Sequence, residues 1–421
     1  MQLLPLLLSL GSASTLVAGN WPAWRGPNGD GLCTEKNLPT KWSATENIAW
    51  KIELPGPGQS TPVVWSDRIF LTQARPSDGA RGLMCLNAKD GSLRWDRWIP
   101  WTLKEPSHEA NPPCSSSAVT DGSRVVALLG SAGLFCCDMD GKELWKRSLG
   151  PLEHEWGYGA SPVIEGNRVI VNFGPGAGAF LGAFDLATGA PVWKVAIPEE
   201  RPLKRTDGFS GNESKGVVGS WTTPVLMTAA GRREVVFPFN SRLRGFDPAD
   251  GRQLWSCEGL TPLFYASPIP SGDTVFLVSG YRGNALAVKA GGSGDVTEKS
   301  RLWHEVGAKS GIGTGVASEG KVYYHTGSLG LCRDVVTGKI LWEERLRGTS
   351  GNVDSWSSIT LADGLLYIPN QAGDVIVVRA SPAFEIVAVN SIGGEKCNAS
   401  LAAADGRLYL RTHERLWAIG K

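Results

Sequence analysis

One short pattern recurs along the chain, and its clearest copy reads Leu134-Phe-Cys-Cys-Asp-Met-Asp-Gly-Lys-Glu-Leu-Trp145. It consists of a hydrophobic strand, a turn that contains Asp138 and Gly141, and a second strand with Trp145 four residues after the glycine. The same glycine–tryptophan spacing is found at Gly91/Trp95, Gly189/Trp193, Gly251/Trp255 and Gly338/Trp342. A repeat of roughly 40 to 60 residues that contains only short strands predicts a β-propeller.

A second signature marks the expected start of the innermost strand of each blade. It combines small hydroxyl residues, often a proline, and β-branched residues, and it occurs at Ser60-Thr-Pro-Val-Val64, Ser116-Ser-Ala-Val119, Ala160-Ser-Pro-Val-Ile164, Thr222-Thr-Pro-Val-Leu226, Ala266-Ser-Pro-Ile269, Gly313-Thr-Gly-Val316, Ser357-Ser-Ile-Thr360 and Ala399-Ser-Leu401. Proline has no N–H to donate to a neighbouring strand, so it suits an edge, and the strand that lines a propeller channel is an edge. Eight starts predict eight blades.

The two ends of the chain explain how the ring closes. The C-terminal copy has three strands and ends with Leu416-Trp-Ala-Ile419, whereas Asn47-Ile-Ala-Trp-Lys-Ile-Glu53 resembles a last strand without a blade. Pairing the two completes the eighth blade and removes the open edges of the array. We therefore predict an all-β fold, an eight-bladed β-propeller of four-stranded antiparallel blades over residues 47–421, closed by an N-terminal strand that completes the C-terminal blade.

The residues before the propeller divide into two segments. Residues 1–19 contain a leucine-rich stretch followed by small residues, which predicts a secretory signal peptide cleaved near Gly19 and therefore an exported, periplasmic or extracellular protein. The apolar stretch is too short to span a bilayer, and no cysteine follows it that would indicate a bacterial lipid anchor. Residues 20–46 are expected to form an irregular arm that packs on the ring.

Composition excludes some functions and leaves the cysteines open to two interpretations. The net charge of +1 lacks the basic excess expected of a nucleic-acid-binding protein. Eight cysteines in an exported chain permit disulfides. However, Cys85, Cys136 and Cys332 occupy a position that other copies fill with Ala183 or Gly245, which favours a small buried packing position.

These motifs, together with Trp21-x-x-Trp-Arg-Gly-Pro27 and Gly291-Gly-Ser-Gly-Asp-Val296, resemble the PQQ-binding-like β-propeller repeat proteins. That superfamily also contains quinoprotein alcohol dehydrogenases and the outer-membrane assembly factor BamB. The resemblance implies PQQ with calcium as a possible cofactor, but no motif places the family's calcium-binding carboxylate. The vicinal pair Cys136-Cys137 lies inside an expected strand and not in a loop above the channel, which favours a packing role.

Polar and aromatic residues gather in the loops of one face, where the longer connections and four of the five histidines are expected. These residues are expected to ring the mouth of the channel and to form a ligand pocket. The alternative is that they only cap strands. The candidates are His108, Asn111, His154, Trp156, Tyr158, Trp221, Tyr265, Tyr281, Arg282, His325, Asn352, Asp354, Trp356, Asn370, Asn398 and His413.

These observations predict a monomeric, non-catalytic propeller without a membrane span that binds a small molecule, glycan, peptide or protein partner at the channel mouth. The alternatives are a PQQ-dependent oxidoreductase and a BamB-like assembly scaffold. A metal site is not expected, because no two histidines have ligand spacing in the sequence. Gly291 to Asp295 is expected to form a long turn followed directly by a strand.

Overall fold

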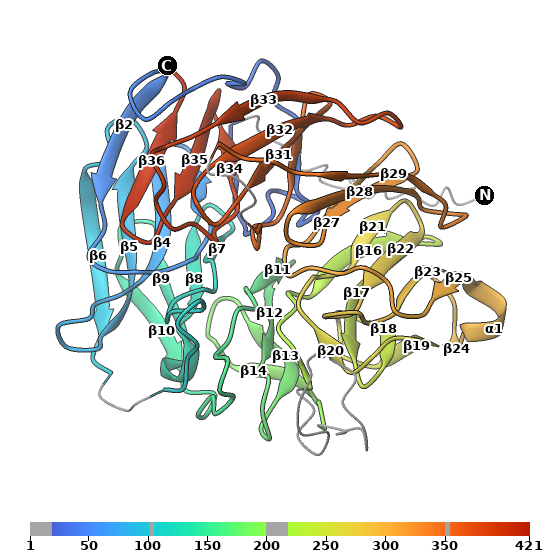
Figure 1. Cartoon of the computed structure of the whole chain (residues 1–421). Helices are drawn as coiled ribbons and strands as arrows, with labels where there is room; N and C mark the ends of the chain where they lie inside the picture. The colour runs from blue at the N-terminus through green and yellow to red at the C-terminus, as the bar shows by residue number, and fades with distance from the viewer. Residues whose placement is uncertain (1–18, 102–104, 199–217, 350–353) are drawn as a thin grey trace, which may run out of the picture.

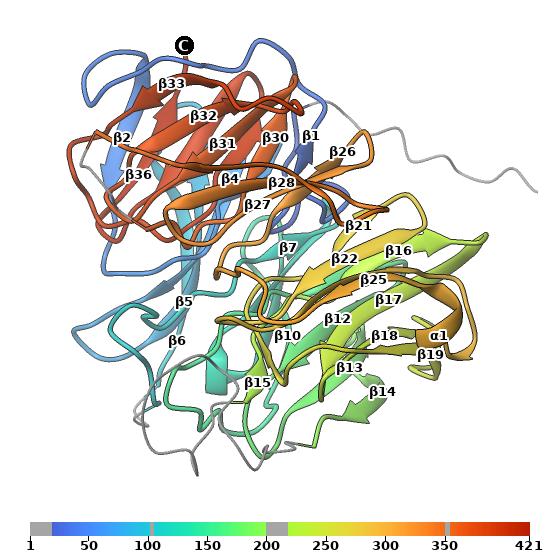
Figure 2. The same cartoon turned by 45° about the vertical axis from the view of Figure 1, so that its right-hand side comes forward.

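Eight four-stranded antiparallel sheets surround a central axis in the computed structural model, which describes residues 19–101, 105–198, 218–349 and 354–421 (Figures 1 and 2). The predicted all-β eight-bladed propeller is confirmed.

In each blade the first strand lies nearest the axis and the last lies outermost. The blades are, in chain order, blade 1 with β3 (Val63–Trp65), β4 (Arg68–Ala74), β5 (Arg81–Asn87) and β6 (Leu93–Ile99); blade 2 with β7 (Val119–Thr120), β8 (Arg124–Leu128), β9 (Leu134–Asp138) and β10 (Glu143–Arg147); blade 3 with β11 (Val163–Glu165), β12 (Arg168–Phe173), β13 (Phe180–Asp185) and β14 (Pro191–Ala196); blade 4 with β16 (Val225–Ala229), β17 (Arg232–Phe239), β18 (Arg242–Phe246) and β19 (Gln253–Glu258); blade 5 with β21 (Ile269–Ser271), β22 (Thr274–Val278), β23 (Ala285–Lys289) and β25 (Arg301–Glu305); blade 6 with β26 (Val316–Ser318), β27 (Lys321–His325), β28 (Leu329–Asp334) and β29 (Ile340–Arg345); blade 7 with β30 (Thr360–Ala362), β31 (Leu365–Pro369), β32 (Val375–Arg379) and β33 (Ile386–Asn390); and blade 8 with β34 (Ala402–Ala404), β35 (Arg407–Arg411), β36 (Arg415–Ile419) and β2 (Ile48–Glu53).

A few short elements lie outside this pattern. They are β1 (Leu32–Cys33), which runs parallel to β30; β15 (Gly219–Ser220), which pairs with β20 (Leu263–Phe264); β24 (Gly294–Asp295), which pairs with β19; the 3-10 turn Gly130–Ala132; and α1 (Thr297–Ser300). The expected long turn at Gly291 to Asp295, followed directly by a strand, is therefore wrong in part. The segment adds β24 to blade 4 and passes through the single turn of α1 before β25 begins.

The repeated aspartate–glycine turn serves to dock one blade on the next. Asp138 Oδ1 accepts the backbone N–H groups of Asp140 and Lys142, at 3.0 and 2.9 Å, which holds the turn. Gly141 has φ of 82°, and a Cβ placed on it would lie 2.6 Å from the Trp95 ring of blade 1. Only glycine meets both conditions. The Trp95 Nε1–H donates to the carbonyl oxygen of Met139 at 3.0 Å, so tryptophan and turn are joined by contact and by hydrogen bond.

The same docking recurs at several junctions of the ring, whereas β33 of blade 7 has no tryptophan and the tryptophan of blade 4 has another partner. Trp145 donates to the Leu186 carbonyl and Trp193 to the Pro248 carbonyl, each at 3.0 Å. In blade 4, Trp255 instead donates to the buried carboxylate of Glu234 in its own sheet, at 2.6 Å. Blade 5 carries the inserted segment with β24 and α1 in place of the aspartate–glycine turn, so the turn that would receive Trp255 is missing there.

The cysteine positions of the repeat are small because each lies directly opposite a docked tryptophan. Cys85 pairs with Trp95, Cys136 with Trp145, and Cys332 with Trp342 across neighbouring strands. Across the described residues all eight cysteines have free thiols, and seven of them are buried. Burial raises the pKa of the Cys136 thiol to about 12. These thiols therefore pack as small hydrophobic groups.

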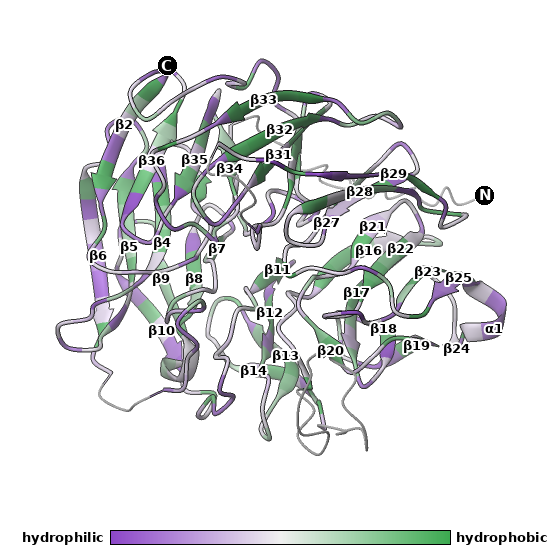
Figure 3. Cartoon of the chain, viewed as in Figure 1, coloured by the Kyte–Doolittle hydropathy of each residue, from purple (hydrophilic) through white to green (hydrophobic). Residues whose placement is uncertain are grey.

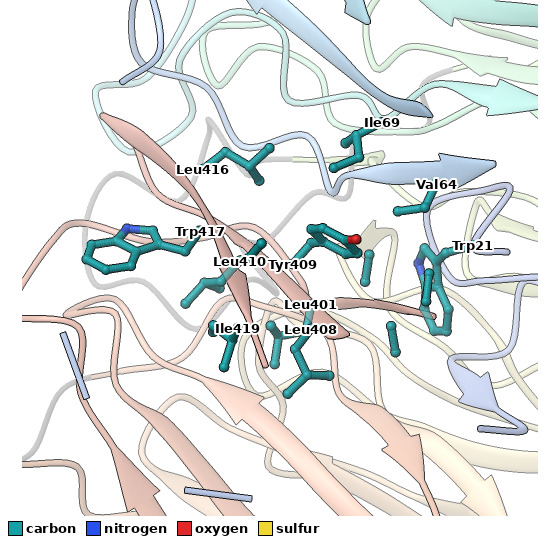
Figure 4. Close-up of a cluster of buried hydrophobic side chains, with 14 of the residues drawn as sticks. Trp21, Val64, Ile69, Leu401, Leu408, Tyr409, Leu410, Leu416, Trp417 and Ile419 are labelled. Carbon is teal, nitrogen blue, oxygen red and sulfur yellow. The ribbon is translucent and has the colours of Figure 1, made fainter. Parts of the chain in front are cut away.

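The predicted closure of the ring is also confirmed. β2 pairs antiparallel with β36, with Lys51 opposite Trp417, so the N-terminal strand completes blade 8. The C-terminus lies beside β2 in Figure 1. Buried side chains of blades 8 and 1 fill the closure, with Trp21 of the N-terminal arm among them (Figure 4). Arg411 adds a buried clamp: its guanidinium donates to the Thr72 carbonyl at 2.8 Å and to Ser60 Oγ of the blade 1 segment.

Hydroxyl side chains join all eight blades at the start of their innermost strands. Each backbone N–H donates to the hydroxyl of the next blade, at 2.8 to 3.3 Å, and the last blade returns to the first. We call this set the hydroxyl belt; its members are Thr61, Ser117, Ser161, Thr223, Ser267, Thr314, Ser358 and Ser400. The belt explains why every copy of the second signature contains serine or threonine at this position.

The hydrophobic core lies between neighbouring blades and not on the axis. Clusters of buried side chains fill each junction, and hydrophobic residues concentrate in the inner strands of the blades, whereas outermost strands such as β10 and β29 carry many hydrophilic residues (Figure 3). Among the described residues, no helix is long and apolar enough to cross a membrane.

The N-terminal arm enters the channel from the face that carries the turns after the first and third strands of the blades. Trp21 exchanges backbone hydrogen bonds with Val64 of β3, each 2.8 Å long, and its ring is buried. Arg25 is buried as well and donates to the carbonyl oxygens of Thr314 and Ile359, each at 3.2 Å. The arm thus spans from blade 1 to blades 6 and 7 at this end of the channel.

Candidate functional site

A cavity of about 420 Å³ lies on the axis at the face of the long loops, and we call it the cup. Half of the predicted site residues line it: His108, Asn111, Trp156, Trp221, Tyr265, Tyr281, Trp356 and Asn398. The others that line it are Trp24, Gln59, Thr61, Ala110, Ser115, Gly159, Thr223, Ile312, Thr314, Ser358 and Ser400.

The wall of the cup follows a simple rule. Every blade contributes the residue two positions before its belt hydroxyl, because alternate side chains of an extended segment point to the same side. We call these residues the wall row; they are Gln59, Ser115, Gly159, Trp221, Tyr265, Ile312, Trp356 and Asn398. The wall row and the hydroxyl belt are therefore successive levels of one channel.

Aromatic rings from blades 3 to 5 form a continuous cluster in this wall. The ring centroids of Trp156 and Trp221 are 5.9 Å apart, those of Trp221 and Tyr265 5.6 Å, and those of Tyr265 and Tyr281 5.3 Å. The Trp221 Nε1–H donates to the Gly157 carbonyl at 2.9 Å, which fixes its ring against the loop before blade 3. Such contacts orient large apolar surfaces toward the cavity.

The loop between blades 1 and 2 is held over the cup by side-chain amides. Asn111 donates to the Trp156 and Tyr158 carbonyls, at 2.7 and 3.0 Å, and its Oδ1 accepts the Ser115 hydroxyl at 2.7 Å. Asn398 donates to the Ala110 carbonyl at 3.2 Å. Asn111 therefore uses its hydrogen-bonding groups to position the loop.

Trp24 contributes to the floor of the cup. It reaches the cavity from the arm, and the neighbouring Arg25 guanidinium lies 5.6 Å from its ring centroid. Burial lowers the pKa of Arg25 to about 10, so this side chain stays charged at neutral pH. Trp24 was not predicted, because the arm was expected only to pack on the ring. Gln59 and the belt were not predicted either, although an alignment of the copies of the second signature could have indicated them.

Four predicted residues lie close to the cup without lining it. His154 stands behind the wall, with its ring 4.7 Å from that of Trp221. Tyr158 is buried below the loop, where its hydroxyl accepts the Cys114 N–H at 3.3 Å and burial raises its pKa well above the usual value. Arg282 and Asp354 are exposed, and Asp354 helps burial to raise the pKa of Tyr281.

Three further candidates lie where the second strand of a blade leads into the third, with His325 as the last residue of β27 and Asn370 and His413 in the turns after β31 and β35. Asn370 is buried and accepts the Asp374 N–H at 2.9 Å within the β31–β32 turn. His413 lies in a separate surface groove beside Lys396 and Arg415. His325 is buried next to blade 7, where its Nε2 lies 2.8 Å from the Ser357 carbonyl. Asn352 lies outside the described residues.

His325 gives the fold a pH dependence. Burial lowers its pKa below 6.5, although the Ser357 carbonyl and Asp354 oppose this shift. As the pH falls through about 6.5 the unfolded chain takes up a proton before the folded protein does, so stability is lost toward acid. Between about pH 7.5 and pH 5, the Tm of the wild type should fall further than the Tm of His325→Gln. We expect the two decreases, measured by calorimetry, to differ by roughly 2 °C or more.

The exposed histidine at position 108 supplies the control for this experiment. His108→Gln removes a histidine on the surface of the loop and should keep the acid sensitivity of the wild type. Equal sensitivity in the wild type and in His325→Gln would mean that other groups cause the loss.

The cup is electrically neutral at its surface. Among the described lining residues none is lysine, arginine, aspartate or glutamate. Within the same described parts of the chain, no group of three or more histidine, cysteine or acidic side chains is placed to hold a metal ion. Its chemistry is therefore that of aromatic faces, amides and hydroxyls.

Comparison with family models finds one family, described as outer membrane protein assembly factor BamB. Its model matches residues 32–201 and 135–300, which together extend over more than half of the chain. No curated protein sequence matches this chain.

Several solved structures share the fold at low sequence identity. A europium-containing methanol dehydrogenase aligns with a TM-score of 0.70 and 10% identity over 96% of this chain and 98% of its own. BamB from Moraxella catarrhalis aligns with a TM-score of 0.58 and 15% identity, over 88% and 96%. A quinohemoprotein alcohol dehydrogenase from Comamonas testosteroni aligns with a TM-score of 0.64 and 12% identity, over 96% and 81%. At such identities the likeness extends to the fold alone.

Proposed function

The chain belongs to the PQQ-like β-propeller family described by the BamB model, and we propose that it binds a small uncharged ligand in the cup. The proposal is argued from the cup because the fold of this family does not determine chemistry. One observation carries this proposal. The described lining combines six aromatic side chains with amides and hydroxyls, and it contains no acidic or basic side chain apart from His108. Its volume of about 420 Å³ lies within the range of small-molecule sites.

A metal-bound quinone fits this lining poorly. Calcium prefers carboxylate and carbonyl oxygens, and the carboxylates of PQQ would need cationic donors for tight binding. The described wall and floor offer neither carboxylates nor surface cations. Because dehydrogenases are among the structural neighbours, a quinone-dependent activity is the alternative function for this chain. No oxidation step is assigned to the cup.

The family model supports a second candidate, a role in protein assembly. A partner that enters the cup with an apolar segment would use the same aromatic wall. Affinity capture from a cell envelope fraction, with wild type and Trp221→Ala as baits, separates the two: an assembly role predicts an envelope protein retained by the wild type and lost with the variant.

We also propose that the protein is exported, on the basis of the leucine-rich segment at residues 1–19. Expression of the full chain in a host with a secretion pathway should give a periplasmic or secreted product whose N-terminal sequence begins near Asn20. A product that keeps Met1 and stays in the cytoplasm would contradict export.

Replacing Trp221 by alanine tests ligand binding. Trp221 lines the cup and contacts both Trp156 and Tyr265, so its loss removes the centre of the aromatic wall. We expect uncharged compounds that raise the Tm of the wild type to bind the variant at least about tenfold more weakly, since such aromatic contacts contribute on the order of 1.4 kcal/mol. Binding is measured by calorimetric titration.

Trp98 is the matched control, because it is a half-buried tryptophan of β6 that stacks on Arg75 away from the cup. Trp98→Ala should keep the affinity of the wild type. Compounds that bind Trp221→Ala as tightly as the wild type, or hits that consist only of anions, would refute the proposal.

A further inference from the structure

We infer that the ligand of the cup is a saccharide, held with its C–H face on the aromatic wall and its hydroxyl groups toward the amides and the hydroxyl belt. This inference rests on the proposed function and names its substrate class. It is carried by the distribution of side chains around the cup, by unsatisfied hydroxyl donors at the belt, and by the position of Trp24.

The wall row divides the cup into two chemically different halves. Blades 4, 5 and 7 contribute Trp221, Tyr265 and Trp356, and the loop before blade 3 adds Trp156 on the same side as Trp221. Blades 8, 1 and 2 contribute the polar side chains Asn398, Gln59 and Ser115. A pyranose ring has the matching division: its C–H face is apolar, and its edge carries hydroxyl groups. Stacking the C–H face on an aromatic ring removes apolar surface from water while the edge keeps its hydrogen bonds.

The belt supplies hydrogen-bonding groups whose capacity is only partly used. Five of its members line the cup: Thr61, Thr223, Thr314, Ser358 and Ser400. Each is at least nine-tenths buried, and each oxygen accepts one backbone N–H, as Thr314 Oγ1 does from Ser267 at 2.9 Å. Within the described residues these five hydroxyls donate to no other group. A hydroxyl can donate one hydrogen bond and accept two, so each still offers a donor and an acceptor toward the cavity.

Other uncharged ligand classes satisfy the cup less completely. A purely apolar ligand would cover the belt and leave its hydroxyl hydrogens unpaired, which costs about 1–3 kcal/mol for each buried group. A flat heteroaromatic compound can stack on the wall but carries few groups for the belt. Sugar hydroxyls both donate and accept, as the belt hydroxyls do, so neighbouring hydroxyls of one ring can pair with neighbouring members of the belt.

Trp24 completes the site from below. Its backbone position is fixed by Arg25, whose guanidinium is bound to carbonyl oxygens of blades 6 and 7. Because these carbonyls are already occupied, the floor presents the Trp24 ring and the belt hydroxyls to the ligand. Trp24 is therefore a specificity-determining residue of this site, contributed by the arm.

The test is a calorimetric titration of the mature chain with neutral sugars, after a screen on an array of neutral glycans. The defined probes are glucose, galactose, N-acetylglucosamine and the disaccharides cellobiose and lactose; adenosine and indole serve as uncharged flat comparators. We expect at least one sugar to bind the wild type. Trp24→Ala should weaken this binding at least about tenfold, and Thr314→Val about threefold or more, since one hydrogen bond contributes about 0.5–1.5 kcal/mol.

Two further variants separate binding from folding. Thr314→Ser keeps the hydroxyl and should restore the affinity that Thr314→Val loses. Thr360→Val removes a buried hydroxyl that donates to the Leu401 carbonyl at 2.9 Å outside the cup, and it should leave sugar binding unchanged.

The outcomes distinguish this inference from the proposed function. If adenosine or indole binds in a Trp221-dependent manner and no sugar does, the saccharide inference fails and the proposed function stands. If no uncharged probe binds, both fail. Sugar binding that is equal in the wild type, Trp24→Ala and Thr314→Val would place the sugar elsewhere and overturn the inference.

Discussion

Trp21→Ala is expected to destabilise the folded protein by about 3–5 kcal/mol, the usual cost of removing a fully buried tryptophan. The ring of Trp21 lies in the cluster that joins blades 8 and 1, beside Val64 (Figure 4). Only 1% of the residue is exposed, so alanine would leave a large cavity. The indole N–H has no partner among the described atoms, so the mutation breaks no hydrogen bond of this side chain and the expected destabilisation comes from lost packing. Urea unfolding followed by tryptophan fluorescence measures the change.

Trp24→Ala is the internal control, because Trp24 is only partly buried and belongs to the same arm. Its loss should change the free energy of unfolding by less than about 1 kcal/mol while it weakens ligand binding. A small effect of Trp21→Ala on unfolding would mean that the arm contributes little to the ring. A large effect of Trp24→Ala on unfolding would assign Trp24 to packing and not to the ligand.

Replacement of Ile48–Glu53 by a Gly-Ser sequence of equal length is expected to lower the Tm by more than about 10 °C, which corresponds to a loss of several kcal/mol. β2 supplies the outermost strand of blade 8, its Trp50 donates to the Ala88 carbonyl at 3.1 Å, and its Lys51 ammonium lies 4.6 Å from the Trp417 ring centroid. Without this strand the edge of β36 is open and the first and last blades are no longer joined by a shared sheet.

The same replacement in β10 isolates the effect of closure. Residues 143–147 also form an outermost strand with a docked tryptophan, Trp145, but blade 2 is joined to its neighbours by continuous chain. The β10 variant should lose clearly less stability than the β2 variant and should elute at the same volume as the wild type in size-exclusion chromatography. Equal losses in the two variants would show that β2 acts as any outer strand and not as the closure of the ring.

The repeats made the fold predictable, because most copies place a turn residue, a glycine and a tryptophan at the same spacing. Asp138, Gly141 and Trp145 have fixed roles in a turn and a docking contact, and the copies could be counted. The exception at blade 4 was not predictable from its own copy, since Gly251 and Trp255 keep the spacing there. It depends on the next blade, where the segment around Gly291 forms β24 and α1 and offers no turn to dock on.

The candidate site was predicted only in part, for a geometrical reason. Residues just before an innermost strand, such as Trp221 and Trp356, line the cup because the strand starts point them at the axis. His325 ends the second strand β27, and His413 follows the second strand β35; second strands lie one position further from the axis. Polarity alone could not separate the two groups. Counting two residues back from each belt hydroxyl would have separated them.

The hydrogen bonds of Arg25 set the order in which the cup can form. Its guanidinium binds carbonyl groups that lie 289 and 334 residues later in the chain. A contact of such sequence separation closes only after most of the intervening chain has folded, because the loop entropy must be overcome first. Trp24 therefore reaches its place among the last steps, although it lies far before these carbonyl groups in the sequence. Any ligand that needs this floor is recognised only by a completed ring, so binding itself reports that all eight blades are in place.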